Sequence, residues 1–219
     1  MNIVIRAINK FVFKLQTNTD RWFCKRRAAR LIKTDFSIIS NNCWGGFVYQ
    51  HFGLPYLSPT AGIYFFASDY IRFLKDLKYY IGHDVKSISA DESKYRDILY
   101  KLHQENVPIG LIDDVEVVFL HYKTFEEALD KWNRRKARIS WENLYIKMSY
   151  MNCCNDDLVY EFDKLPYKNK FIFVTKDYGI KSQIIMTDRK DDDTILNDTD
   201  WFNKYINVTN FINTGDICQ

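Results

Sequence analysis

Proline and glycine are scarce in this chain, and long apolar runs are absent from it. Only 4 prolines and 8 glycines occur among 219 residues, which excludes collagen-like and low-complexity chains. No run of about 18 apolar residues occurs, so no segment of the sequence is expected to cross a membrane as a helix. No C-x-x-C pair occurs either, so the spacing typical of structural zinc sites is missing.

The cysteines number five, which is an odd count. The apolar residues of the first segment are interrupted by Arg6 and Lys10, and no small-residue cleavage site follows, so we do not expect a secretory signal. Free thiols in a reducing cytoplasm are the natural interpretation. We therefore expect a cytoplasmic protein, and peripheral attachment to the inner face of the cell membrane stays open.

Apolar and aromatic residues are plentiful. Hydrophobic residues make up 47% of the chain and charged residues 27%, which is typical of a globular protein with a sizeable core. Aromatic residues reach 16%. Because aromatic side chains favour the half-buried surface of a pleated strand, we expect a substantial amount of sheet.

Positive charge is concentrated at the start of the chain. Residues 1–33 carry nine Lys/Arg and one acid, a net charge of +8, whereas residues 34–219 carry 22 Lys/Arg and 27 acids, a net charge of −5. The spacing over residues 3–15 predicts a basic amphipathic helix, which would lie on an anionic membrane surface or pack on its own domain. Nucleic acid is not an expected partner, because the body is acidic and no binding motif occurs.

Predicted helices alternate with apolar strands along residues 34–219. This pattern predicts an α/β layered domain with a mixed, mostly parallel sheet flanked by helices, which could divide into two sub-domains near 105–115. A hairpin at Asp113-Asp114 and the charged strand 143–149 are expected to be antiparallel additions at one side. The expected strands are 36–40, 62–66, 85–89, 108–112, 115–121, 143–149, 170–175 and 183–187, and the expected helices are 47–52, 69–81, 92–104, 124–137 and a short one near 200–206.

A polar loop rich in hydrogen-bond donors follows the first strand and precedes a helix. Its glycines would let backbone amides approach a ligand closely, and a helix N-terminus favours an anion. The loop therefore predicts part of a site for a phosphate, diphosphate or carboxylate, although it matches no established nucleotide motif. Its residues are Ser40, Asn41, Asn42, Cys43, Trp44, Gly45 and Gly46.

Cys43 is a candidate nucleophile, because a thiolate is favoured near the start of a helix. Such a nucleophile needs a base, and His121 at the end of a predicted strand is the best candidate. The alternatives are a buried, inert cysteine and a histidine that makes only a structural hydrogen bond.

A cluster of cations near residue 135 forms a second candidate group. Arg135 and Arg138 are three residues apart and would share one face of a continuing helix, where two guanidinium groups suit a phosphate or carboxylate. Trp141 offers a stacking surface for a sugar or base, and Asn143 adds a polar contact. The alternative is a solvated helix end, where cations also favour the helix dipole.

The acid pair Asp156-Asp157 is expected in a loop after a strand, where a metal-dependent sugar transferase would hold a divalent ion. Adjacent acids are more typical of a solvated turn or a helix cap. We therefore assign no metal site, and the sequence identifies no cofactor.

Several short motifs lie between roughly residues 35 and 176. They are Phe36–Gly46, Tyr49, Leu54-Pro55, Ser58–Thr60, Phe119–Tyr122, Glu127-Ala128, Lys131-Trp132, Arg134-Arg135, Arg138-Ile139, Asn143-Leu144 and Leu165–Lys170. In combination they resemble a bacterial family with a domain of unknown function, whose members are commonly labelled exopolysaccharide or capsular polysaccharide biosynthesis proteins. The resemblance implies an α/β fold and a setting in cell-surface polysaccharide synthesis, but it assigns no reaction and no catalytic residue.

Three functions are compatible with these observations. The first is a transferase of surface-polysaccharide assembly whose partner is a nucleotide-sugar or another phosphorylated small molecule, with the 40–46 loop and the arginines holding the anion and His121 as base. The second is an acyl transferase or hydrolase that depends on Cys43 and His121. The third is a non-catalytic adaptor that docks on a membrane polysaccharide-assembly complex through residues 1–33.

Overall fold

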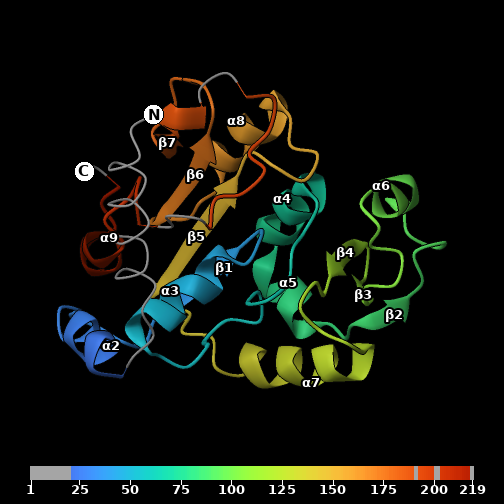
Figure 1. Ribbon diagram of the computed structural model, residues 1–219, viewed down its shortest axis with the longest axis horizontal. Coiled ribbons are helices and arrows are strands. Elements are labelled where there is room, and N and C mark those ends of the chain that lie inside the picture. The colour runs from blue at the N-terminus through green and yellow to red at the C-terminus, as the bar shows by residue number, and fades with distance from the viewer. Residues whose placement is uncertain (1–20, 190–191, 200–202, 218–219) are drawn as a thin grey trace, which may run out of the picture.

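The strands of the protein gather into two sheets, which Figure 1 shows side by side. The computed structural model describes residues 21–189, 192–199 and 203–217. The amphipathic helix expected over residues 3–15 lies outside the described residues, as does Cys218.

Sheet A is entirely parallel, with the strand order β1-β5-β6-β7. Sheet B is antiparallel, with the order β2-β3-β4. The predicted fold class, a mixed and mostly parallel α/β architecture flanked by helices, is confirmed. The strands are β1 (Ser37–Ser40), β2 (Lys86–Ile88), β3 (Ile109–Ile112), β4 (Val115–Val118), β5 (Leu144–Ser149), β6 (Lys170–Val174) and β7 (Gln183–Ile185).

Both faces of sheet A are covered by helices, as expected for parallel strands rich in apolar residues. Alternate residues of each strand therefore enter two different apolar layers: Ile39 and Ile146 face one layer, while Ile38 and Tyr145 face the other. In Figure 1 the helices α4 (Ala67–Lys75), α5 (Leu77–Gly82) and α8 (Asp156–Lys164) lie on one side of sheet A, and α3 (Trp44–Phe52) and α9 (Val208–Thr214) on the other.

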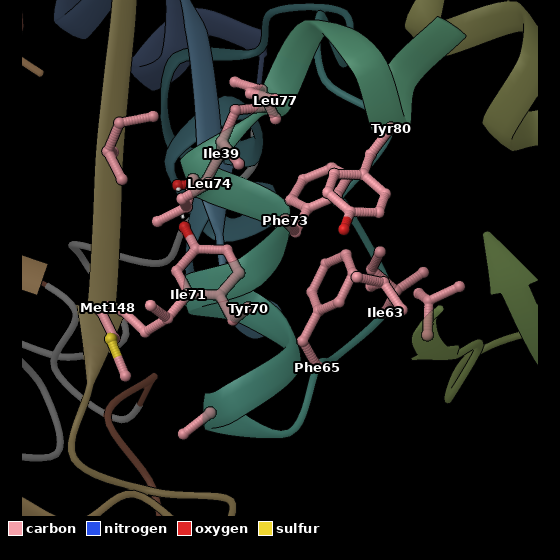
Figure 2. Packing of buried hydrophobic residues seen from close by; sticks show 14 of the residues in the cluster. Ile39, Ile63, Phe65, Tyr70, Ile71, Phe73, Leu74, Leu77, Tyr80 and Met148 are labelled. Atoms are coloured by element: carbon pink, nitrogen blue, oxygen red, sulfur yellow. Dashed lines mark hydrogen bonds between the residues drawn. The ribbon is translucent and has the colours of Figure 1, made fainter. Parts of the chain in front are cut away.

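The larger apolar layer joins sheet A to sheet B. Figure 2 shows Tyr70 and Phe73 of α4 in this layer, with Tyr70 between Ile39 and Met148 of sheet A. The Tyr70 hydroxyl lies 2.9 Å from the carbonyl oxygens of both Ile39 and Lys147, which share its one proton, so α4 is bonded to two neighbouring strands. Helix α7 (Phe125–Lys136) adds Trp132 to the same layer.

Sheet B has a smaller apolar layer of its own. Helix α6 (Arg96–Lys101) contributes Leu99, which packs with Ile109 and Val118. The predicted hairpin between β3 and β4 is confirmed, and Asp113 takes the left-handed backbone conformation at its turn, with φ 55°.

Several predicted elements differ from the structure. The helix expected over 69–81 is two helices, because Asp76 leaves the helical conformation and its side chain caps α5 by accepting from the Tyr79 N–H. The strand expected at 62–66 is reduced to a single bridge between Tyr64 and Val118. The helix expected over 92–104 is confined to α6, and the helices α8 and α9 were not predicted.

The charged strand 143–149 is not an antiparallel addition. Its residues form β5, which pairs in parallel with β1 and β6 at the centre of sheet A. The prediction was wrong because Lys147 made the strand look solvent-facing, whereas this lysine is fully buried and its charge is compensated inside the protein.

Part of the basic segment packs on the body of the protein. Helix α2 (Arg21–Ala28) buries Cys24 against α3, and Arg27 Nε donates to the His51 carbonyl oxygen at 2.7 Å. Gly53 ends α3 with φ 64°, and a Cβ there would lie 2.8 Å from the Cys24 Cβ. None of the described helices is long and apolar enough to cross a membrane.

Residues 192–199, here called the strap, run across the carboxyl ends of β5 and β6. The Thr175 hydroxyl donates to the Asp192 carbonyl oxygen, and the Ile195 N–H donates to the Tyr150 carbonyl oxygen, each at 2.8 Å. Before the strap, η1 (Thr187–Arg189) makes one 3-10 turn. The strap therefore brings C-terminal residues to the edge of the sheet where ligands of open parallel sheets bind.

Replacing Tyr70 by phenylalanine is expected to lower the free energy of unfolding by about 1–2 kcal/mol, because two buried carbonyl oxygens lose their donor. Urea denaturation measures the change. Tyr160→Phe, at an exposed tyrosine of α8, serves as the control and should leave the midpoint nearly unchanged. An equal shift in both variants would show that the Tyr70 hydroxyl does not tie α4 to the sheet.

Candidate functional site

Cys43 lies between the carboxyl end of β1 and the first turn of α3. The side-chain oxygen of the preceding residue, Asn42, accepts from the N–H of Trp44, the first residue of the helix, at 3.1 Å. Gly45 allows α3 to approach β1 closely, because a Cβ there would lie only 3.0 Å from Ile38 Cγ2. These contacts fix the backbone that carries the Cys43 thiol.

His121 lies just after β4 of sheet B, and its side chain extends to Cys43 at the end of sheet A. The bridge between Tyr64 and Val118 holds the chain near residue 62 against the end of β4, and the His121 N–H donates to the Gly62 carbonyl oxygen at 3.3 Å. His121 Nε2 then lies 3.1 Å from the Cys43 Sγ. Two residues 78 positions apart in the chain are therefore within hydrogen-bonding distance of each other.

The environment of Cys43 favours the protonated thiol. Burial raises the pKa of Cys43 to about 11, and the negative charge of Asp198 acts in the same direction. The ammonium group of Lys147 and a backbone hydrogen bond oppose this rise without cancelling it. At neutral pH the sulfur carries its proton, so nucleophilic attack requires a base in contact with it, and His121 is in that position.

A buried ion pair lies beside Cys43. Lys147 of β5 and Asp198 of the strap are in direct contact, and both side chains are almost fully shielded from solvent. Asn42 links the two, since its amide donates to Asp198 Oδ1 at 2.8 Å and its oxygen accepts from Lys147 Nζ at 2.9 Å. The Ser149 hydroxyl also donates to the Asp198 carboxylate.

Asp198 is held in its charged form. Burial alone would favour the neutral acid, but Lys147, Ser149 and Asn42 outweigh it and hold the pKa of this carboxyl below its usual range. The ammonium group of Lys147 also lies 5.8 Å from the centre of the Trp44 ring. The two opposite charges form a buried, hydrogen-bonded unit next to the loop that carries Cys43.

Two cavities meet at Cys43 and His121. The α7 cavity, of about 400 Å³, is bounded by α3, α7 and the segment near residue 61. The strap cavity, of about 760 Å³, is mainly apolar and is bounded by the strap, α6 and the end of β4. Cys43 and His121 line both cavities. The wall of the α7 cavity also includes Gly46, Gln50, Tyr56, Glu127, Lys131 and Arg135. The wall of the strap cavity also includes Phe66, Ile98, Leu102, Leu120, Leu196 and Asp198.

The predicted loop residues are divided between the cavities and the interior. Gly46 lines the α7 cavity and Asn42 the strap cavity. Asn41 is fully buried, and its side chain bonds to both the N–H and the carbonyl oxygen of Ser149. Ser40 bonds to Asn42, while Trp44 and Gly45 pack inside the protein.

The second predicted group is only partly brought to the cavities. Arg135 lines the α7 cavity, but α7 ends at Lys136, so Arg138 does not share a helical face with it and is exposed. Trp141 lies beneath the Lys78 ammonium group, 5.5 Å from the ring centre. Asn143 bonds to Lys33 and Asp35 at the amino end of β5, away from the end at which Cys43 lies.

The acid pair Asp156-Asp157 is not in a loop. It occupies the first turn of α8, which Asn155 caps, and Asp156 pairs with Lys176. Across the described residues, no group of three or more His, Cys, Asp or Glu side chains could hold a metal ion.

Lys147, Asp198 and Tyr56 are the site residues that the sequence analysis missed. A single lysine inside an apolar strand is a detectable signal for Lys147, because a buried lysine requires a partner. Asp198 is one of several acids in an irregular stretch, and Tyr56 is one of 15 tyrosines, so no local signal distinguishes either residue.

A protein-family model matches residues 15–218, which is almost the whole chain. The chain belongs to the DUF1919 family. This family is described as a domain of unknown function. An uncharacterized protein of Haemophilus influenzae is 30% identical to this DUF1919 chain over 159 residues, which cover 72% of this chain and 71% of the relative. Neither the family description nor the name of the relative states a reaction.

Lys147→Met is expected to lower the free energy of unfolding by about 3–5 kcal/mol, because Asp198 would be left as a buried, uncompensated charge. Urea denaturation measures the loss. Lys147→Met combined with Asp198→Asn should recover part of it, since the unpaired charge is gone. As a control, Lys176→Met removes an exposed ion pair and should have little effect. Equal effects of the two single lysine variants would contradict the structural role of the buried pair.

The alkylation rate of Cys43 by iodoacetamide is expected to rise about tenfold per pH unit from neutral pH to about pH 11, because only the thiolate reacts. Asp198→Asn should move this profile to lower pH, since the Asp198 charge raises the pKa of Cys43. Peptide mass spectrometry follows each cysteine separately.

Cys153 is the internal control for this pH profile. Burial raises the pKa of its thiol, and Asp198 is not among the causes, so Asp198→Asn should not move the Cys153 profile. A Cys43 rate that is already constant from about pH 7 upwards would instead indicate a preformed thiolate stabilised by His121.

Proposed function

We propose that this DUF1919 protein is a cysteine-dependent enzyme of acyl transfer or hydrolysis, with Cys43 as the nucleophile and His121 as the general base and acid. The observation that supports this proposal is the 3.1 Å separation of His121 Nε2 and Cys43 Sγ where two cavities meet. A nucleophile with a base in hydrogen-bonding distance is the minimal unit of covalent acyl transfer.

The first half of the proposed reaction forms an acyl-enzyme. The Cys43 Sγ attacks the carbonyl carbon of a thioester or ester while His121 Nε2 takes the thiol proton. The tetrahedral intermediate then expels its thiol or alcohol, which receives that proton from His121. The partial positive charge at the start of α3 favours the negative charge that develops on the carbonyl oxygen.

The second half transfers the acyl group. A hydroxyl group, of water or of an acceptor, attacks the thioester carbon and gives its proton to His121. The Cys43 sulfur leaves and takes the proton back, which releases an acid or a new ester and restores the enzyme. The strap cavity is the place for an acyl chain, because it is mainly apolar and both Cys43 and His121 lie on its wall.

We propose a sugar hydroxyl as the acceptor, so that the enzyme would modify a cell-surface polysaccharide or one of its precursors. The sequence resemblance to polysaccharide biosynthesis proteins supports this setting. A glycosyl transferase that uses a nucleotide-sugar is less well supported by the geometry, because Asn41 and Trp44 are engaged inside the protein and Arg138 lies outside the cavities. The adaptor hypothesis depends on the basic segment, most of which lies outside the described residues.

Incubation with acyl-coenzyme A thioesters and p-nitrophenyl esters is expected to add one acyl mass to the protein, located on Cys43 by peptide mass spectrometry. Cys43→Ala should abolish this adduct. His121→Ala should slow its formation by about 10²–10⁴-fold, as expected for loss of a general base.

Cys154→Ala serves as the matched control, since burial raises the pKa of that thiol to about 12 and the thiol donates to the Asn155 carbonyl oxygen at 3.5 Å rather than to a histidine. This variant should acylate like the unmodified chain. An adduct that persists in Cys43→Ala would contradict the proposed nucleophile.

A further inference from the structure

Arg135 is a buried cation without an anionic partner among the described residues. Only 9% of this residue is exposed, and it lies in the wall of the α7 cavity. Its Nη1 donates to the Ala61 carbonyl oxygen at 2.7 Å and to the Tyr122 hydroxyl, which are both neutral acceptors. No ion pair to Arg135 forms within the part of the chain that the structure describes.

Burial of a charge without a partner is costly, so such groups are normally paired or bind a ligand. The guanidinium group has five N–H donors in one plane, and its Nε and Nη2 donate to no described residue. The Tyr56 ring covers one face of the group, with the Arg135 Cζ 4.6 Å from the ring centre. The guanidinium plane is therefore held by neutral contacts, and one edge of its donor fork remains for an oxyanion.

The other charged groups of the α7 cavity make no ion pair with Arg135 in the described part of the chain. Lys131 adds a second cation, while Glu127 adds one carboxylate, which accepts from the Lys123 N–H at 3.4 Å and makes no ion pair with Arg135. The Tyr122 hydroxyl, which also donates to the Ala61 carbonyl oxygen, is ordinarily neutral. The cavity therefore has two cations and one anion on a wall that also includes Cys43.

We propose that the substrate carries an oxyanion, a carboxylate or a phosphate, that binds Arg135 in the α7 cavity while the reacting carbonyl lies at Cys43. This inference rests on the proposed function and names the substrate class of the same site. Arg135 is then the residue that determines specificity, and the planar fork of an arginine suits the two oxygens of such a group better than a lysine would. The strap cavity remains for the apolar part of the same substrate.

Two thiol reagents of matched size and opposite charge test this proposal. The 2-sulfonatoethyl and 2-(trimethylammonium)ethyl methanethiosulfonates both form a disulfide with a thiolate and release methanesulfinate. The ratio of the anionic to the cationic rate is measured at Cys43 and at the exposed Cys153, which is the internal reference. We expect a higher ratio at Cys43 than at Cys153.

Arg135→Met is expected to lower the ratio at Cys43 by about tenfold, the effect of losing one charge-assisted contact, and to leave the ratio at Cys153 unchanged. Arg138→Met is the matched control, because it removes the same charge from an exposed position outside both cavities. Arg135→Lys keeps the positive charge but loses the planar guanidinium donors, so the ratio of anionic to cationic reagent rates at Cys43 should stay close to that of the unmodified chain. An unchanged ratio in Arg135→Met would overturn the proposal.

Competition separates the two oxyanions and does not depend on a variant. Inorganic phosphate and acetate are each added while neutral methyl methanethiosulfonate modifies Cys43 in the unmodified chain. Protection by phosphate alone indicates a phosphorylated substrate, and protection by acetate alone indicates a carboxylated one. Absence of protection by both would overturn the proposal, even if Arg135→Met does not fold.

The two proposals fail in different ways. If acyl thioesters label Cys43 but the reagent ratio does not depend on Arg135, the anion subsite is wrong and the acyl-enzyme chemistry stands. If no acyl adduct forms on Cys43 while the ratio still depends on Arg135, the cavity binds an oxyanion but the proposed reaction is wrong.

Discussion

The ion pair between Lys147 and Asp198 joins three parts of the chain that are far apart in sequence. Lys147 lies in the central strand β5, Asp198 in the strap, and Asn42 in the loop after β1 bonds to both. Each charge would be costly alone in this environment, but together with Asn42 and Ser149 they satisfy one another. The position of the strap and the conformation of the loop therefore depend on the same hydrogen-bonded unit.

This unit also determines the electrostatics at Cys43. Asp198 raises the pKa of the thiol and Lys147 lowers it, so the two charges of the pair act on the sulfur in opposite directions. Burial adds to the effect of Asp198, and the sulfur remains protonated at neutral pH. His121 Nε2, 3.1 Å from the sulfur, is therefore placed to act on the protonated thiol as a base in the proposed reaction, rather than as the counter-ion of a preformed thiolate.

The two cavities at Cys43 and His121 divide the candidate site into two chemically different halves. On one side, α7 presents a buried arginine held by Tyr122 and the Tyr56 ring. On the other side, the strap and α6 form a larger apolar cavity. A substrate with an anionic end and an apolar acyl end would place its carbonyl group where the halves meet, at Cys43.

Local patterns in the sequence were sufficient to predict much of the fold and to identify two residues of the candidate site. The alternation of helices and apolar strands predicts the α/β class, and the polar loop before α3 and the end of β4 identify Cys43 and His121 as candidates, because these patterns reflect local backbone and burial preferences. The break at Asp76 was missed because a single capping side chain ends the helical pattern there.

Only the tertiary structure decides which of these candidates meet. The parallel pairing of β1 with β5 places Asn143 at the opposite end of the sheet from Cys43, and the end of α7 at Lys136 separates Arg138 from Arg135. The burial of Lys147 and its pairing with Asp198 depend on contacts across 51 positions of the chain. The sequence by itself determined the type of each element and the chemistry of each side chain, whereas long-range packing determined their distances, because those depend on contacts that no local window contains.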